Sequence, residues 1–194
     1  MDPTLDPLIV AIPSHDGRAA IFTVLELRTI SELLGRSTVV VSGEASNIPR
    51  SRNVILEQVR EKYPDRASRW MLWIDSDIVL LRQSVSAVVE AIRWAEAHHA
   101  SIVANYRMAS GVNVLMAHPD HHHLTDDELQ ALPDYGEVAM AGLGFAYLNQ
   151  PLPYMFHADA TGEDIHFWRD HPEIHLHCAK QIHLGHKKAV LLTS

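Results

Sequence analysis

Short apolar strands and amphipathic helices alternate through the first half of this 194-residue chain, and this order leaves few folds open to it. Apolar or β-branched runs predict strands, whereas apolar residues spaced three and four apart and ended by glycine or proline predict helices. The expected strands are Leu8–Ile12, Thr38–Val41, Trp70–Ile74 and Ile102–Ala104, and the expected helices are Ala19–Leu34, Pro49–Tyr63 and a segment around Val85–Ile92. The β-α-β-α-β-α-β order predicts an α/β fold with a mainly parallel central sheet flanked by helices.

The second half is less regular. Further strands are expected at Glu137–Met140, Phe145–Leu148, Ile174–Cys178 and Ala189–Leu192, and helices after the capping box at Thr125 and over Glu163–Asp170. Since no repeat or linker is evident, residues 1–194 are predicted to form a single domain.

The charge and cysteine content restrict the partners and the compartment. A formal net charge of -8 argues against a nucleic-acid polymer as the main partner, because backbone binding needs a basic surface. The sequence contains no apolar stretch of transmembrane length, and its acidic start lacks the basic residues of a secretory signal. With the single cysteine, Cys178, which fits a reducing compartment, these features predict a cytoplasmic location and leave the oligomeric state open.

Asp75-Ser76-Asp77 closes the apolar run that ends at Ile74. Side chains two apart on a strand point the same way, so two carboxylates are expected to project together from the strand end. Their repulsion is relieved by a cation, and oxygen ligands favour Mg²⁺ or Mn²⁺. The alternative is an ordinary strand-to-turn junction, where Asp and Ser are common.

Other polar residues lie where ligands bind in parallel sheets, beyond the carboxyl ends of the strands. They follow the first two strands at Pro13-Ser14 and at Ser42–Glu44. Arg52, in the first turn of the second helix, either lies near a diphosphate or is solvated. The pair Gly142 and Gly144 either lets the backbone approach a sugar or forms a plain turn.

Two later segments can carry chemistry. Glu163 and Asp164 open a short helix, either as capping carboxylates or with a general base among them. His186 is followed by Lys187, so this pair is either a surface segment or an imidazole metal ligand with a lysine near a phosphate.

Taken in order, these segments resemble the GT-A-type, family-2-like, nucleotide-sugar-dependent glycosyltransferases. The matching segments are Val10–Ser14, Arg50–Asn53, Trp73–Asp77, Ala141–Phe145, Thr161–Asp164 and Leu184–His186, which span nearly the whole chain. The resemblance implies a Rossmann-like nucleotide-binding domain. It also implies an enzyme that moves a hexose from a UDP- or GDP-sugar to a hydroxyl-bearing acceptor with Mn²⁺ or Mg²⁺.

The resemblance also implies roles. Asp77 matches the direct metal ligand, with Asp75 on the ribose side of the metal site, and His186 matches the late histidine that completes it. Asp164 matches the catalytic base of inverting members, with Glu163 beside it for acceptor hydroxyls. The residues expected to bind the nucleotide sugar are Pro13, Ser14, Glu44, Arg52, Asp75, Ser76, Gly142, Gly144 and Lys187.

Parts of the chain depart from the family, and other functions stay open. Little sequence follows His186, where many members carry acceptor-binding helices, and the histidine-containing segment 108–133 has no counterpart. One alternative is a metal-dependent hydrolase built on His118-Pro119-Asp120-His121. The others are a sugar-nucleotide pyrophosphorylase, for which no glycine-rich N-terminal phosphate loop is present, and a non-enzymatic His-rich metal-binding module.

Overall fold

The computed structural model describes residues 6–14, 19, 21–44, 47–64, 70–108, 110–118, 122–149 and 163–186. At positions 21, 22, 44, 117, 118, 163 and 186 it describes the backbone alone.

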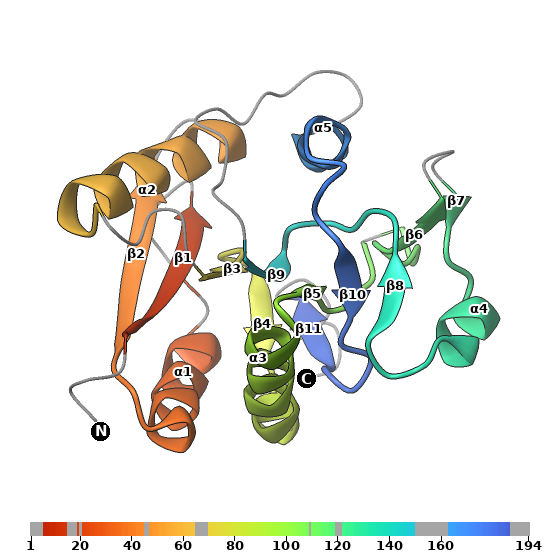
Figure 1. Cartoon of the computed structure of the whole chain (residues 1–194), viewed down its shortest axis with the longest axis horizontal. Coiled ribbons are helices and arrows are strands. Elements are labelled where there is room, and N and C mark those ends of the chain that lie inside the picture. The colour runs from red at the N-terminus through yellow and green to blue at the C-terminus, as the bar shows by residue number, and fades with distance from the viewer. Residues whose placement is uncertain are drawn as a thin grey trace.

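Seven strands form a central sheet in the order β2-β1-β3-β9-β5-β10-β8 (Figure 1). Their bounds are β1 Leu8–Ser14, β2 Thr38–Glu44, β3 Met71–Ile74, β5 Ser101–Val103, β8 Gly136–Val138, β9 Phe145–Leu148 and β10 Leu176–Cys178. β1 pairs in parallel with β2 and β3, and β5 pairs in parallel with β10. β9 runs antiparallel to both β3 and β5, and β8 runs antiparallel to β10. The sheet is therefore mixed, with β8 and β9 opposed to the other five strands.

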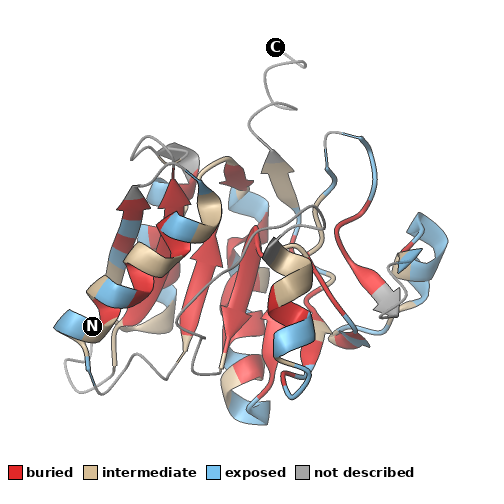
Figure 2. Ribbon diagram, turned by 90° about the horizontal axis from the view of Figure 1, so that it is seen from above, coloured by how far each residue is buried: buried red, intermediate tan, exposed pale blue. Residues whose placement is uncertain are grey.

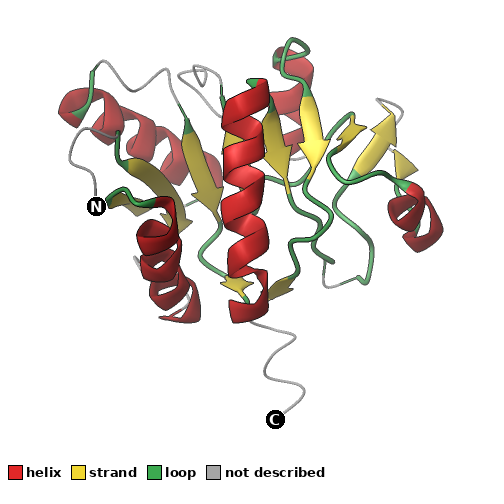
Figure 3. Cartoon of the chain, turned by 60° about the horizontal axis from the view of Figure 1, so that its bottom comes forward, coloured by secondary structure: helices red, strands yellow, loops and turns green. Residues whose placement is uncertain are grey.

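Helices cover both faces of this sheet. Their bounds are α1 Ile21–Leu34, α2 Ile48–Lys62, α3 Val85–His98, α4 Asp126–Ala131 and α5 Glu163–Asp170, with a 3₁₀ turn, η1, at Arg82–Ser84. α1 and α3 lie side by side on one face, whereas α2 and α5 lie on the other (Figures 1 and 3). The predicted α/β fold with a central sheet flanked by helices is confirmed.

Alternation along the strands gives the sheet two separate cores. In β3, Met71 and Trp73 join the core under α2 and α5, whereas Leu72 and Ile74 join the core under α1 and α3. Buried residues therefore fill the sheet and the inner faces of the helices, and exposed residues lie on the outer helix faces (Figure 2). Burial of each large aliphatic side chain contributes about 1.5–3 kcal/mol.

Two small ribbons complete the described chain. β4 (Ile78–Leu80) pairs antiparallel with β11 (Leu184–His186), and β6 (Met116–His118) pairs antiparallel with β7 (His122–His123). These strands were not predicted, because two or three residues are too few to show a period. The strand predicted at 189–192 lies outside the described residues.

Local signals placed the short helices well. The predicted capping box opens α4: the Thr125 hydroxyl accepts from the Glu128 N–H, and the Glu128 carboxylate accepts from the Thr125 N–H. Within the described segments, none of the helices has the length and apolar character that crossing a bilayer requires.

Candidate active site

The ends of β1 and β2 form one polar edge of the sheet. Because the two strands are parallel and in register, Pro13 lies opposite Gly43, and Ser14 lies opposite Glu44. Pro13, Ser14 and Glu44, all expected to bind the nucleotide, therefore share one edge. The side chain of Glu44 lies outside the described part.

The start of α2 sits directly on this edge. The Asn47 side chain accepts from the Arg50 N–H at 2.9 Å and caps the helix. The Ser51 hydroxyl donates to the Ser14 carbonyl at 3.1 Å. A Cβ atom on Gly43 would collide with the Ser51 carbonyl oxygen, so only glycine permits this approach. Because α2 packs in this way, Arg52 lies below the end of β3, the strand that neighbours β1.

Asp75, Ser76 and Asp77 form a turn after β3 has ended. The Ile78 N–H donates to the Asp75 carbonyl at 3.0 Å, which closes a four-residue β-turn, and β4 begins at Ile78. The prediction that the two carboxylates follow the two-residue period of a strand is therefore wrong, since Ser76 and Asp77 occupy the centre of the turn. The Asp75 N–H donates to the Gly144 carbonyl at 2.9 Å, which ties this turn to the glycine pair.

Arg52 lies beneath Asp75. Its guanidinium donates to an Asp75 carboxylate oxygen at 2.9 Å, and the Arg52 and Asp75 side chains are 1% and 24% exposed. The guanidinium carbon also lies 5.3 Å from the centre of the Trp73 ring, within cation–π range. Arg52 was expected near the nucleotide; the structure brings it to Asp75, which lies between it and solvent.

Tyr106 lies against both glycines of the 142–144 loop. A Cβ atom on Gly142 would lie 2.6 Å from the Tyr106 hydroxyl oxygen, and one on Gly144 would lie 2.5 Å from it. The Tyr106 phenol therefore takes the space that the missing side chains leave, a contact that no pattern in the sequence indicates. The spacing of the glycines signalled a close approach, but not which group makes it.

The Tyr106 hydroxyl group interacts electrostatically with both Asp75 and Asp164. Burial is the main cause that raises the pKa of Tyr106 well above its usual value, and the Asp75 and Asp164 carboxylates raise it further. The Arg52 charge and a hydrogen bond with the Gly144 backbone oppose this rise. Tyr106 therefore stays a neutral hydroxyl at physiological pH, and its environment includes the charges of both Asp75 and Asp164.

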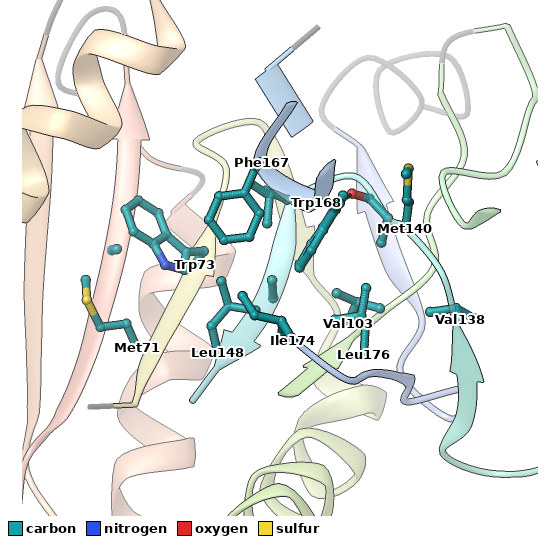
Figure 4. Packing of buried hydrophobic residues seen from close by; sticks show 14 of the residues in the cluster. Met71, Trp73, Val103, Val138, Met140, Leu148, Phe167, Trp168, Ile174 and Leu176 are labelled. Carbon is teal, nitrogen blue, oxygen red and sulfur yellow. Dashed lines mark hydrogen bonds between the residues drawn. The ribbon is translucent and has the colours of Figure 1, made fainter. Parts of the chain in front are cut away.

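α5 positions Asp164. Phe167 and Trp168, three and four residues further along, share a helix face with Asp164 and are buried. Both rings point from α5 into the core that also contains Trp73 and Ile174 (Figure 4). The Trp168 indole N–H donates to the Ala141 carbonyl at 2.6 Å, which fixes α5 over the glycine loop.

A cavity of about 320 Å³ opens beside this helix. Asp164 and Gly142, two predicted site residues, line it together with Tyr106. His123, from the histidine-containing segment 108–133, also lines it. The structure thus brings Asp164, the glycine loop and His123 of the histidine-containing segment to one cavity.

The backbone of His186, the predicted third metal ligand, lies close to the turn formed by Asp75, Ser76 and Asp77. His186 pairs with Ile78, the residue directly after Asp77, because β11 lies antiparallel to β4. The His186 imidazole, the Glu163 side chain and Lys187 lie outside the described part.

The donor types of Asp75, Asp77 and His186 suit a hard divalent cation. Among the side chains that the structure describes, no group of three His, Cys, Asp or Glu residues has the geometry to hold a metal ion. Since the His186 imidazole is not among them, the metal assignment stays a prediction.

The segment proposed for a hydrolase is only partly described. Residues 119–121 lie outside the described part, and His118 is described in its backbone alone. Next to this segment, His122 faces the Glu128 carboxylate at 3.4 Å on the exposed side of α4. His123 points elsewhere, into the cavity beside Asp164.

No protein-family model matches this sequence, and no curated protein matches it. Among solved structures, A197 from STIV superposes with a TM-score of 0.61 at 14% identity, over 93% of this chain and 85% of that chain. This likeness shows a shared fold alone.

Two further structures superpose more loosely. A glycosyltransferase involved in the glycosylation of the major capsid of PBCV-1 gives a TM-score of 0.39 at 15% identity, over 74% of this chain and 60% of that chain. An apo UDP-glucose pyrophosphorylase gives 0.47 at 11% identity, over 78% of this chain and 58% of that chain. Neither superposition is close enough to support an argument about function.

Proposed function

We propose that this protein is a GT-A-type glycosyltransferase that moves a hexose from a UDP- or GDP-sugar to a hydroxyl group of an acceptor. The observation that carries the proposal is the meeting of the two acidic motifs around Tyr106. Asp75 and Asp164 are far apart in sequence, yet the Asp75 N–H is hydrogen-bonded to Gly144, which Tyr106 contacts, and Asp164 lines one cavity with Tyr106. An inverting, metal-dependent transferase needs one acid at the donor metal site and a second acid that accepts the proton of the acceptor hydroxyl.

In this proposal the nucleotide lies along the ends of β1, β2 and β3. The base and ribose contact Pro13, Ser14 and Glu44, and Ser76 and Lys187 lie near the ribose and the phosphates. Arg52 does not need to touch the nucleotide, because its role is to hold the Asp75 carboxylate in place from below. The register of β1 and β2 supports this arrangement, because it places Pro13, Ser14 and Glu44 at one edge of the sheet.

Asp75, Asp77 and His186 would hold Mn²⁺ or Mg²⁺. When bound, the cation stabilises the negative charge that develops on the departing nucleoside diphosphate. The pairing of β11 with β4 supports this ligand set, because the His186 backbone lies beside the D-x-D turn.

Asp164 acts as the general base. As the donor sugar carbon loses its bond to the diphosphate, the Asp164 carboxylate accepts the proton of the attacking acceptor hydroxyl. Trp168 and Phe167 hold the helix so that this carboxylate faces the cavity rather than solvent. Glu163, next to it in α5, would also contact the acceptor.

The decisive experiment is a panel of UDP- and GDP-sugars with Mn²⁺, in which released nucleoside diphosphate and thermal stabilisation are both measured. Asp164→Asn, which keeps the shape but removes the base, is expected to lower transfer by about a hundredfold to ten-thousandfold. Nucleotide affinity, measured by calorimetry, should stay within about threefold of the unmodified protein, since Asp164 is placed on the acceptor side.

Asp170→Asn provides the matched control, because Asp170 is exposed at the other end of α5. This variant should transfer sugar normally. An Asp164→Asn variant that loses nucleotide affinity while keeping normal turnover would contradict the proposed role. If no sugar nucleotide in the panel binds, the proposed function itself fails.

A further inference from the structure

The cavity beside Asp164 has mainly apolar walls. The apolar side chains that line it come from four parts of the chain and include Met108, Val114, Met116, Met140, Ile165 and Trp168. Polar side chains reach it from Tyr106, His123 and Asp164. An apolar cavity with a few polar groups is typical of a site for a small organic molecule.

This lining disfavours a sugar as the molecule that enters. Each hydroxyl of a polyol loses its water on entry and costs about 1–3 kcal/mol if no protein group replaces it. The polar side chains of the wall can serve one or two hydroxyls, and Tyr106 already has a hydrogen bond with the Gly144 backbone. The flexible thioethers of Met108, Met116 and Met140 instead fit an apolar ring or chain.

His123 offers a second polar contact. Its Nδ1 atom is buried and has no hydrogen-bond partner within the described segments. Backbone pairing of β7 with β6 sets His123 opposite Met116, in the cavity wall. A ring nitrogen in this position is costly unless a bound molecule supplies the missing partner.

We infer that this cavity is the acceptor site and that the acceptor is an amphipathic alcohol with one hydroxyl at Asp164, an apolar body against the methionines and a second polar atom at His123. The acceptor role rests on the proposed transferase function, whereas the chemical class of the ligand rests on the cavity alone. At roughly 30 Å³ for each water-sized unit, 320 Å³ holds a body of about ten non-hydrogen atoms, the size of a substituted phenyl ring.

Methionine methyl NMR tests the inference without any donor. The probes are 2-phenoxyethanol and xylitol, which are similar in size but differ in polarity. We expect 2-phenoxyethanol to shift the methyl signals of Met108, Met116 and Met140. The Met71 signal should not move, because this residue lies in β3 away from the cavity lining. Xylitol should shift none of these signals.

A matched pair of variants tests the location. Met108 and Val112 are 38% and 37% exposed on one loop, joined by a 2.9 Å hydrogen bond from the Met108 N–H to the Val112 carbonyl. Met108 lines the cavity, whereas Val112 is not among its lining residues. Met108→Glu should weaken 2-phenoxyethanol binding by about tenfold or more, since a carboxylate replaces an apolar wall. Val112→Glu should leave the affinity unchanged.

The outcomes separate the two proposals. If a sugar nucleotide binds but 2-phenoxyethanol shifts no cavity methionine, or xylitol shifts them instead, the ligand class is overturned and the transferase proposal stands. Equal loss of affinity in Met108→Glu and Val112→Glu would also overturn the cavity as the binding site. If the cavity methionines respond but no sugar nucleotide binds, the amphipathic ligand stands and the transferase role falls.

Discussion

Among the described residues, Arg52 is the charged side chain with almost complete burial, and its cost must be offset locally. Removing a guanidinium from water is tolerated when a carboxylate and an aromatic ring replace the water. Asp75 and Trp73 supply these contacts. The arrangement leaves Asp75 at the boundary between the core and solvent, where it is held in a defined direction and can still be reached by a ligand.

Arg52→Met is expected to destabilise the protein by about 1–3 kcal/mol, because Asp75 loses its charged partner but keeps contact with solvent, and the buried volume stays similar. Urea unfolding measures this loss, and the double variant Arg52→Met with Asp75→Asn should regain part of it. Arg50→Met, on the exposed side of the same helix turn, should change stability by less than about 0.5 kcal/mol. Equal effects of the two single variants would rule out the buried pair as a source of stability.

The sequence indicated which residues belong to the candidate site better than it indicated how these residues are arranged. Asp75, Asp164 and Gly142 were identified from short motifs, since carboxylates at strand and helix ends and paired glycines are local signals. Tyr106 was missed, because nothing near it in the sequence marks a tyrosine that meets glycines almost forty residues later, at positions 142 and 144. The β-turn over Asp75–Ile78 was weighed as an alternative, and it is the geometry that the structure adopts.

At the scale of elements, α5 is a short helix whose orientation depends on two aromatic anchors. Eight residues are too few to form a stable helix alone, so packing must hold it. Phe167 and Trp168 meet edge to face with ring centres 4.7 Å apart, and Trp168 adds its hydrogen bond to Ala141. The direction of Asp164 is therefore set by side chains one turn away.

Trp168→Phe is expected to cost about 1–3 kcal/mol, because the Ala141 carbonyl loses its donor in a buried setting. Hydrogen exchange should rise selectively in residues 163–170, and transfer should fall more than nucleotide affinity.

Trp94→Phe is the control for this prediction. Trp94 stacks on Tyr135 with ring centres 4.2 Å apart but belongs to α3, on the opposite face of the sheet. This variant should leave exchange in α5 unchanged. Uniform acceleration of exchange in both variants would contradict a local anchoring role for Trp168.

The first four predicted strands and three predicted helices match β1, β2, β3, β5, α1, α2 and α3 to within a few residues, because their periodicity is local. The position of β9 was not predictable in the same way. Phe145–Leu148 was expected as a strand, but its insertion between β3 and β5 depends on contacts that span more than forty residues. Periodicity identifies a strand and says nothing about its neighbours.

At the scale of the whole molecule, the sheet separates a core that carries the candidate site from a core that supports it. The α2 and α5 face contains Trp73, Phe167 and Trp168, next to the cavity and the buried Arg52. The core on the α1 and α3 face is packed mainly with Leu, Ile and Val, and Tyr106 contacts it from the candidate site. Tyr106 therefore links the candidate site to both cores.

UDP and Mn²⁺ together are expected to raise the melting temperature by about 5–10 °C at a hundredfold excess over Kd, which corresponds to about 2.7 kcal/mol. Either a chelator or the Asp77→Ala substitution should abolish most of this rise, since the proposed metal site then fails. Asp170→Ala should retain it. Differential scanning fluorimetry measures all four cases, and an equal rise with UDP alone would contradict the metal assignment.

The central place of β9 also affects how the protein is made. During synthesis, β1, β2, β3 and β5 leave the ribosome well before Phe145–Leu148, the segment that joins β3 to β5. Until that segment is synthesised, the nascent chain exposes one unpaired edge on β3 and one on β5. Each of these edges can pair with a strand of another protein. The nascent chain is therefore prone to aggregate before β9 has been synthesised, and chaperones that cover unpaired strand edges would be most useful at this stage of translation.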